Sequence, residues 1–366
     1  MKFDHQHYVP CLRWKQGEYQ AIFRLLGNSK HFITPLIEVP ETGYDFETKT
    51  SKHTIDKHLE LFTKRVVKKW GTNPCIVDIS LVKSSERLAD GRYPLEFVFD
   101  ELRENFCEAI PATGLDKDKI FGTMIKKITS IDKHGLCIRF NIEEASKPEL
   151  RKSIEAILSI NGLNADQCDL VLDLEAPNFE PIDGFAKLCV SIIKRLPQLH
   201  QWRTFTLCAT SIPVSMSGMK QGQTLLNRSE WLLYKRIVEV LAAQNYRLPT
   251  FGDYCINHPE ISAVDMRFVK PYAQIRYTAE NSWLIVKGTN VRDNGFEQYR
   301  DLCRTITKSI YYLGKDFSFG DEYIADCAKG HANTGTLTTW RMVGTSHHIK
   351  KVVVDISRFF GSGGNP

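Results

Sequence analysis

Short apolar runs alternate with helical patterns along most of the 366-residue chain, and this alternation limits the fold more than any other feature. Several of the runs are continuously apolar, as expected for strands that are covered on both faces. The runs predicted as strands cover residues 8–14, 32–39, 75–81, 108–113, 136–142, 169–174, 204–210 and 250–256. Apolar residues spaced by three or four predict helices with one buried face over residues 18–26, 55–70, 95–106, 119–131, 149–160, 185–196 and 230–243.

Strands that alternate with helices indicate βαβ units and a parallel sheet. Eight strands spaced roughly 35 residues apart fit a (β/α)₈ barrel, which is typically about 250 residues long. We therefore predict an α/β fold with a TIM-like barrel, whose eighth helix covers residues 296–313. A doubly wound sheet is less compatible, because no G-x-G-x-x-G motif follows the first strand.

The chain after the eighth strand predicts two additions to the barrel. Residues 272–278 and 283–287 flank a polar turn and predict a β-hairpin inserted after that strand. The tail predicts a helix near residues 321–328, a loop rich in Gly and Thr, and a strand-like or helical run over residues 350–360. We expect a barrel domain over residues 1–316, including the hairpin 270–290, and a C-terminal helical extension over residues 317–366 packed on it.

Composition excludes several classes of protein. The net charge of 48 − 43 = +5 permits a polyanionic partner such as nucleic acid without requiring one. The ten cysteines form no C-x-x-C pair, which removes the local signature of zinc ribbons and thioredoxins. The N-terminus lacks the apolar core of a signal peptide, and no apolar run is long enough to span a membrane. We expect a reduced, cytoplasmic protein with no membrane partner.

Four charged residues lie near the ends of apolar strands, where a charge is costly unless it is paired or hydrogen-bonded. They are Glu38, Asp78, Arg139 and Asp173. One interpretation is that they pair with each other, or with Lys15, and close the top of the barrel. The other is a polar mouth that binds a charged small molecule or a phosphate, since barrel active sites lie at the carboxyl ends of the strands.

The candidate site residues follow from these positions. Those predicted to act as acid, base or metal ligand are Glu38, Asp78, Asp173 and Asp253, and Glu175 is a further carboxylate of this kind. Those predicted to bind the ligand are Lys15, Arg139, Tyr254, Arg276 and Tyr277. Nothing fixes a metal geometry, so no metal ligand is assigned and the cofactor is unknown, with Mg²⁺ as an alternative. The adjacent His347 and His348 would not share a helix face, which argues against a joint zinc site.

The opening H-Y-V-P-C-L-R-W-K-Q-G-E-Y, followed by P-L-I-E-V-P-E, resembles the start of the "beta" family of phages, satellite phages and bacterial mobile elements. The usual opening of that family is Y-V-P-x-L-K-x-K-x-G-E, then P-L-x-E. The matching residues are Tyr8, Val9, Pro10, Leu12, Lys15, Gly17, Glu18, Pro35, Leu36 and Glu38. Further matches are Asp78, Asp173, Gly252–Tyr254, Arg276–Thr278, Thr339–Arg341 and His347–Ile349. Arg13 departs from the lysine that the family often has there.

The resemblance implies a genetic context and supplies no reaction. A satellite-phage member lies beside a killing protein, in a cluster linked to defence against other phages. Two hypotheses follow. In one, the chain is a barrel enzyme, a hydrolase that acts on phosphate esters or nucleic-acid components, with a nucleotide, a nucleic acid or another phosphorylated ligand at its mouth. In the other, it is a non-catalytic partner, antitoxin-like or a ligand sensor, of a toxin or defence protein encoded in the same cluster.

Overall fold

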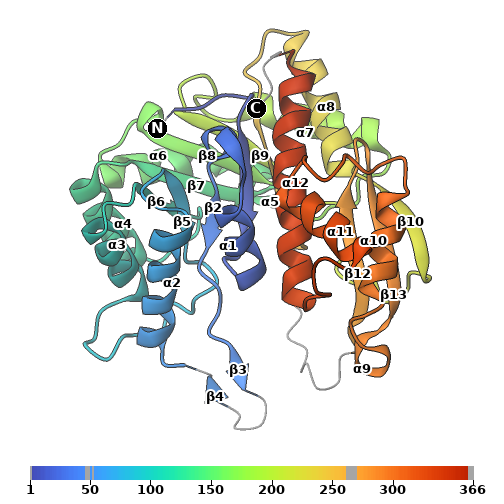
Figure 1. Ribbon diagram of the computed structural model, residues 1–366. Helices are drawn as coiled ribbons and strands as arrows, with labels where there is room; N and C mark the ends of the chain where they lie inside the picture. Colours follow the sequence, from blue (N-terminus) through green and yellow to red (C-terminus); the bar gives the residue numbers. More distant parts are fainter. Residues whose placement is uncertain (1, 46–49, 52, 261–269, 362–366) are drawn as a thin grey trace. The chain divides into compact units, whose positions relative to one another are not determined.

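A computed structural model describes residues 2–45, 50–51, 53–260 and 270–361 (Figure 1). The chain forms two compact units. The barrel unit consists of Met1–Trp14, Thr34–Ala209 and Leu233–Asp253. The second, which we call the helix–sheet unit, consists of Lys15–Ile33, Thr210–Leu232 and Tyr254–Pro366. We describe each unit by itself.

Eight parallel strands close into a barrel in the barrel unit, in the order in which they occur along the chain. The strands are β1 (Tyr8–Leu12), β2 (Leu36–Glu38), β5 (Cys75–Asp78), β6 (Ala109–Thr113), β7 (Leu136–Asn141), β8 (Cys168–Asp173), β9 (Thr204–Cys208) and β11 (Thr250–Asp253). β11 pairs with β1 and closes the ring. All eight predicted strands and the TIM-like barrel are confirmed.

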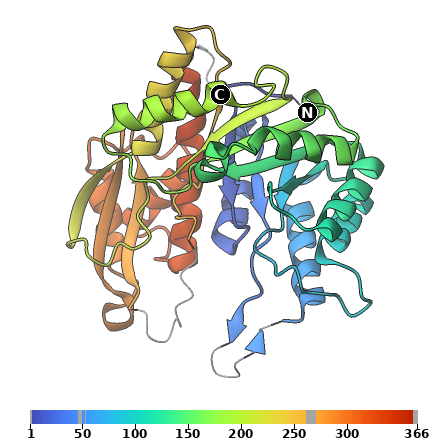
Figure 2. The same cartoon turned by 180° about the vertical axis from the view of Figure 1, so that it is seen from behind.

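Helices follow the strands of this unit and lie outside the ring (Figures 1 and 2). They are α2 (Ile55–Lys69), α3 (Pro94–Glu104), α4 (Lys119–Asp132), α5 (Ile142–Ser146), α6 (Leu150–Asn161), α7 (Ile182–Arg195) and the part of α8 (Ser229–Ala242) from Leu233 onward. The periodicity explains their packing: α2, for example, buries Leu59, Phe62 and Val66 on one face. The unit also contains β3 (Tyr44–Asp45), β4 (Thr50–Ser51) and the 3₁₀ turn η2 (Ala165–Gln167).

A three-stranded antiparallel sheet forms the centre of the helix–sheet unit, in the order β10-β13-β12. β12 (Tyr272–Thr278) and β13 (Ser282–Asn290) are the predicted hairpin. β10 (Gly222–Asn227) lies at the edge and was not predicted, because its residues are mostly exposed and carry no apolar alternation. The helices of this unit are α1 (Gln16–Phe23), η1 (Gly27–Phe32), α9 (Val291–Asn294), α10 (Tyr299–Thr307), α11 (Phe319–Lys329) and α12 (Leu337–Phe359).

Successive residues of β13 pack into two different apolar clusters, as the alternation of a strand requires. Leu284 and Val286 pack with residues of α10, α11 and α12. Trp283 and Ile285 pack with Ile212 and other residues of the segment that precedes β10. The sheet is therefore covered on both faces within its own unit, which explains why the hairpin reads as apolar in sequence.

Two helical predictions differ from the structure. The run predicted as the eighth barrel helix contains α10, whose buried residues belong to the core of the helix–sheet unit. The predicted Gly/Thr-rich loop before residue 350 is largely helical, since α12 begins at Leu337 with a capping box between Thr336 and Thr339. Burial of this helix outweighs the low helix propensity of its Thr and Gly residues. The predicted boundary between residues 316 and 317 does not separate the two units, because hairpin and tail lie together.

A close approach of α1 to α12 explains one residue of the opening motif. A Cβ added at Gly17 would lie 2.7 Å from Arg341 Cβ and 3.2 Å from the carbonyl oxygen of Thr338. Only glycine therefore allows these two helices to pack at this distance. Among the described helices, none is both long enough and apolar enough to cross a membrane.

Candidate functional site

Four of the predicted carboxylates are the last residues of barrel strands. Glu38 ends β2, Asp78 ends β5, Asp173 ends β8 and Asp253 ends β11. All four are at least 94 % buried, so their charges need partners. We call this end of the strands the barrel mouth. The strand register brings Glu38 opposite Asp78 directly.

Arg139 of β7 joins three of these carboxylates. Its Nη1 donates to Glu38 Oε1 and Asp78 Oδ2, both at 2.8 Å. Its Nε and Nη2 donate to Asp173 Oδ2 at 2.9 and 2.7 Å. Each guanidinium nitrogen therefore donates to a carboxylate, and Arg139 is engaged in this cluster rather than presented to an anionic ligand. We call Glu38, Asp78, Asp173 and Arg139 the arginine-centred cluster.

The arginine-centred cluster has more negative than positive groups. Three carboxylates surround one guanidinium, and Arg13 Nε lies 3.6 Å from Glu38 Oε2. Burial raises the pKa of the Asp78 carboxyl, but the Arg139 charge and the hydrogen bonds from Ser80 and Arg139 outweigh it. The pKa of Asp78 therefore lies below its ordinary value, and this carboxylate is ionised at neutral pH.

Glu175 lies two residues beyond β8 and differs from the cluster in its environment. Its side chain is exposed, yet partial loss of hydration raises the pKa of its carboxyl, and the neighbouring charge of Asp173 raises it further. Its backbone N–H donates to Asp173 Oδ1 at 2.9 Å. Its φ of 57° is in the left-handed region, which is unfavourable for a residue with a side chain. Trp14, two residues beyond β1, has a similar φ of 50°. Such strain at strand ends is a frequent mark of functional positions.

Asp253 is held by a partner for which the sequence indicated no role. The Tyr8 hydroxyl donates to Asp253 Oδ1 at 2.5 Å, within the barrel unit. Pro10 of β1 lies opposite Asp253 in the strand register. The signal for Tyr8 was present in the opening motif, which contains it, but the periodicity shows only an apolar strand.

The remaining predicted residues belong to the helix–sheet unit. Lys15 is exposed at the N-cap of α1, and Tyr254 is buried after β11. Arg276 and Tyr277 are consecutive on β12 and so point to opposite faces of the sheet.

Arg276 has no carboxylate partner among the described residues. Its Nη1 donates to the carbonyl oxygen of Ile256. Burial, with the positive charge of Arg341 acting in the same direction, lowers the pKa of Arg276 to about 10. Arg276 therefore stays protonated at neutral pH and fits the predicted role of anion binding better than Arg139 does.

Tyr277 belongs to a buried polar network. Its hydroxyl donates to Asp321 Oδ1 at 2.7 Å, and its ring stacks on His347 with the ring centroids 3.8 Å apart. His347 Nδ1 lies 2.8 Å from Asp321 Oδ2, and its Nε2 lies 2.9 Å from the carbonyl oxygen of Thr278. Both ring nitrogens therefore face oxygen atoms. This network has a structural role, since Tyr277, Asp321 and His347 are all buried.

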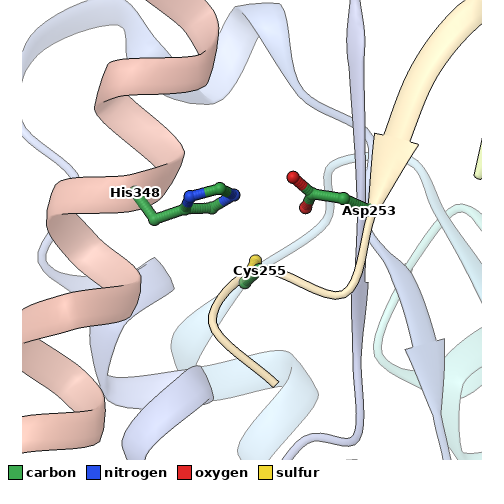
Figure 3. A group of neighbouring side chains, drawn as sticks. All are labelled: Asp253, Cys255 and His348. Atoms are coloured by element: carbon green, nitrogen blue, oxygen red, sulfur yellow. The ribbon is translucent and has the colours of Figure 1, made fainter. Parts of the chain in front are cut away.

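His348 lies beside this network and near a cysteine (Figure 3). Its Nδ1 is 2.9 Å from Thr278 Oγ1, and one of its ring nitrogens lies within 4.8 Å of Cys255 Sγ. Asp253, also labelled in Figure 3, precedes Cys255 by two residues and ends β11 of the barrel unit. We assign no metal ion to these side chains.

Comparison with known proteins gives a family and a distant structural likeness. No curated protein matches the chain. Among solved structures, a GH138 enzyme targeting pectin rhamnogalacturonan II is similar over 80 % of this chain, with 9 % identity and a TM-score of 0.38. The chain spans about 38 % of the length of that structure. The family model described as Beta protein matches residues 8–354, nearly the whole chain, and both units contribute to this match. The chain therefore belongs to the Beta protein family.

Proposed function

We propose that the barrel unit is a hydrolase that cleaves a glycosidic bond in a nucleotide-class ligand, with Glu175 as the general acid. The observation that carries this proposal is the opposite pKa shift of two carboxyl groups at the barrel mouth. The pKa of Glu175 is raised and that of Asp78 is lowered. Carboxyl groups whose environments separate their pKa values in this way are suited to act as acid and base.

The charge of the arginine-centred cluster supports a glycosidic bond over a phosphate ester. Glycoside cleavage passes through an oxocarbenium-like transition state, in which positive charge develops on the sugar. Three carboxylates against one guanidinium stabilise such a charge. A phosphoryl group in transfer carries negative charge and is normally stabilised by cations. In the proposed reaction, Glu175 protonates the leaving base as the bond between base and sugar breaks, and Asp78 accepts a proton from the water that attacks the sugar carbon.

The biological setting of this activity is proposed from the family context. The resemblance described above implies a gene cluster linked to defence against phages. Hydrolysis of a nucleotide-class ligand during infection would suit such a cluster, because it removes a metabolite that phage replication consumes.

The experiment is a substrate panel with two matched variants. Purified protein is incubated with nucleosides, nucleoside monophosphates and dinucleotides, with and without Mg²⁺, and free base is measured by liquid chromatography. Glu175→Gln should lower base release at least about 100-fold, the usual contribution of general acid catalysis. Glu155→Gln is the control, since Glu155 is an exposed carboxylate on α6. Wild-type protein that releases no base from any member, or a fully active Glu175→Gln variant, contradicts the proposal.

The arginine-centred cluster favours a second candidate function. Every guanidinium nitrogen of Arg139 is engaged by a carboxylate, and a cluster held by such internal contacts also suits a non-catalytic ligand sensor or a partner of a neighbouring toxin. A double variant, Asp78→Asn with Asp173→Asn, separates the two functions in a phage-plating assay of the complete gene cluster. If protection survives in a double variant with native circular dichroism, the catalytic proposal fails and the sensor function is favoured.

A further inference from the structure

The opposite end of the barrel unit contains a cavity that the proposed hydrolysis does not use. Its volume is about 530 Å³, within the range of small-molecule sites. It is lined by residues that precede strands, such as His5 before β1, Asp166 before β8 and Leu248 before β11. These positions are at the amino ends of the strands, whereas Glu38, Asp78, Asp173 and Asp253 end theirs.

Aromatic side chains form much of the cavity wall. The rings of His200 and Tyr246 lie 6.2 Å apart at an angle of 33°. Trp202 also lines the cavity, and its buried side chain donates from Nε1–H to the carbonyl oxygen of Pro197 at 2.8 Å. Flat side chains fixed in this way offer a surface to a planar ligand at low cost in conformational entropy.

Two arginines line the cavity, and their charges differ in how they are matched. Arg203 is neutralised, since its Nε and Nη2 donate to Asp169 at 3.0 and 2.7 Å. Arg247 donates only to backbone carbonyls, of Leu199, Trp202 and Arg203, at 3.0, 2.5 and 3.3 Å. The part of the chain that the structure describes offers Arg247 no carboxylate within ion-pair distance.

The carbonyls fix the Arg247 side chain without cancelling its charge. Burial lowers the pKa of Arg247, because the cation has lost part of its hydration shell. The guanidinium nevertheless stays protonated at neutral pH. Two carboxylates also line the cavity, Asp4 and Asp166, and both are exposed. The exposed Lys2 offsets one of them in formal charge.

We propose that this cavity binds a planar aromatic anion, with its ring against His200 and Tyr246 and its carboxylate or phosphate paired with Arg247. The site is distinct from the barrel mouth, so the proposal does not depend on the hydrolase activity. Nucleotides and aromatic carboxylates share this chemistry, and the experiment separates them.

Binding to the full-length protein is measured by isothermal titration calorimetry with three probes: 2-naphthoate, its neutral analogue 2-naphthamide, and AMP. We expect 2-naphthoate to bind at least tenfold more tightly than 2-naphthamide, because only the anion can pair with Arg247. Arg247→Gln should remove this tenfold difference. His200→Ala, a change at an exposed side chain, should weaken both naphthalene probes. Arg151→Gln, at an arginine whose side chain is 62 % exposed on α6, is the control and should change nothing.

Each outcome bears on the proposal. Binding of AMP that is lost in Arg247→Gln supports the site and identifies a phosphate as the anion, whereas binding of 2-naphthoate alone supports it with a carboxylate. AMP binding that is unaffected by Arg247→Gln belongs elsewhere and counts against the site. Equal affinity for 2-naphthoate and 2-naphthamide overturns the proposal. Should Arg247→Gln unfold, unchanged 2-naphthoate affinity in His200→Ala overturns it instead.

Discussion

Replacing Arg139 by methionine tests whether charge holds the barrel mouth together. The side chains of Arg139, Glu38, Asp78 and Asp173 are 16, 8, 6 and 5 % exposed. The substitution keeps an unbranched apolar stem of similar reach but leaves three buried carboxylates without their shared guanidinium. Breaking a buried ion pair by removing one partner typically costs about 3–5 kcal/mol. We expect Arg139→Met to lower the free energy of unfolding by about that amount at pH 7.

The pH dependence of this loss distinguishes charge from packing. In the wild type the pKa of Asp78 is lowered below that of a free Asp carboxyl. Its contribution to the free energy of unfolding is therefore fully present above the ordinary Asp pKa and is lost as pH falls through the folded-state pKa. In the variant, the buried carboxyls lack Arg139 and are protonated at a higher pH than in the wild type. Protonation therefore removes the cost of their buried charges in the variant before it affects the wild type. Each pKa unit corresponds to about 1.4 kcal/mol. The difference between the two proteins should therefore shrink as pH is lowered from 7 toward 4.5.

The assay must report on the barrel unit alone, because a chain with two units need not unfold in one step. Hydrogen exchange of peptides from β7 and β8, followed by mass spectrometry in urea, provides that readout. Arg151→Met is the control, since an exposed i,i+4 pair contributes about 0.5 kcal/mol or less. A loss below about 1 kcal/mol at pH 7, or a loss that is the same at pH 7 and pH 4.5, would refute the reasoning.

Three further predictions follow from the structure. A plot of the rate of base release against pH should be bell-shaped. The fall of the rate at alkaline pH should follow the raised pKa of Glu175, because the acid is then deprotonated. A Glu175→Gln variant whose rate still falls at alkaline pH in the same way would exclude Glu175 as the acid. Tyr277→Phe removes a donor to the buried Asp321 and should lower the free energy of unfolding by about 1–3 kcal/mol in urea titrations, whereas an unchanged midpoint would mean that the network is not structural. Gly17→Ala places a Cβ 2.7 Å from Arg341 and should lower the melting temperature, with a loss of about 1–3 kcal/mol, and a stabilised variant would show that α1 and α12 can separate freely.

The barrel could be predicted from the sequence because its strands are continuous apolar runs at a regular spacing. The hairpin of the helix–sheet unit was predicted as well, but the assembly of that unit was not, since it depends on packing between segments that are distant in the chain. Contacts such as that of Gly17 with Arg341 leave no periodic signal. β10 was missed because an exposed edge strand lacks apolar alternation, and the start of α12 because tertiary burial overrode propensity.

The candidate site was only partly visible in sequence for a related reason. A charge in an apolar strand marks the positions of Glu38, Asp78 and Asp173, but it does not show how they are paired. That all three contact Arg139 depends on strand register and on side-chain rotamers. The raised pKa of Glu175 depends on the charge of Asp173, which is visible two residues earlier in the sequence, and on a partial loss of hydration, which is not.

The arginine-centred cluster also constrains how sequences of this family can diverge. Arg139 is separated along the chain from Asp173, Asp78 and Glu38 by 34, 61 and 101 positions. Replacing one carboxylate by its amide brings the charges closer to balance. Replacing Arg139 first leaves three buried carboxylates without their shared cation. Mutational paths through these four positions are therefore ordered: an acid can be exchanged before the arginine, but the arginine is lost only after the acids. Homologues that lack Arg139 should accordingly have lost most of the acids as well.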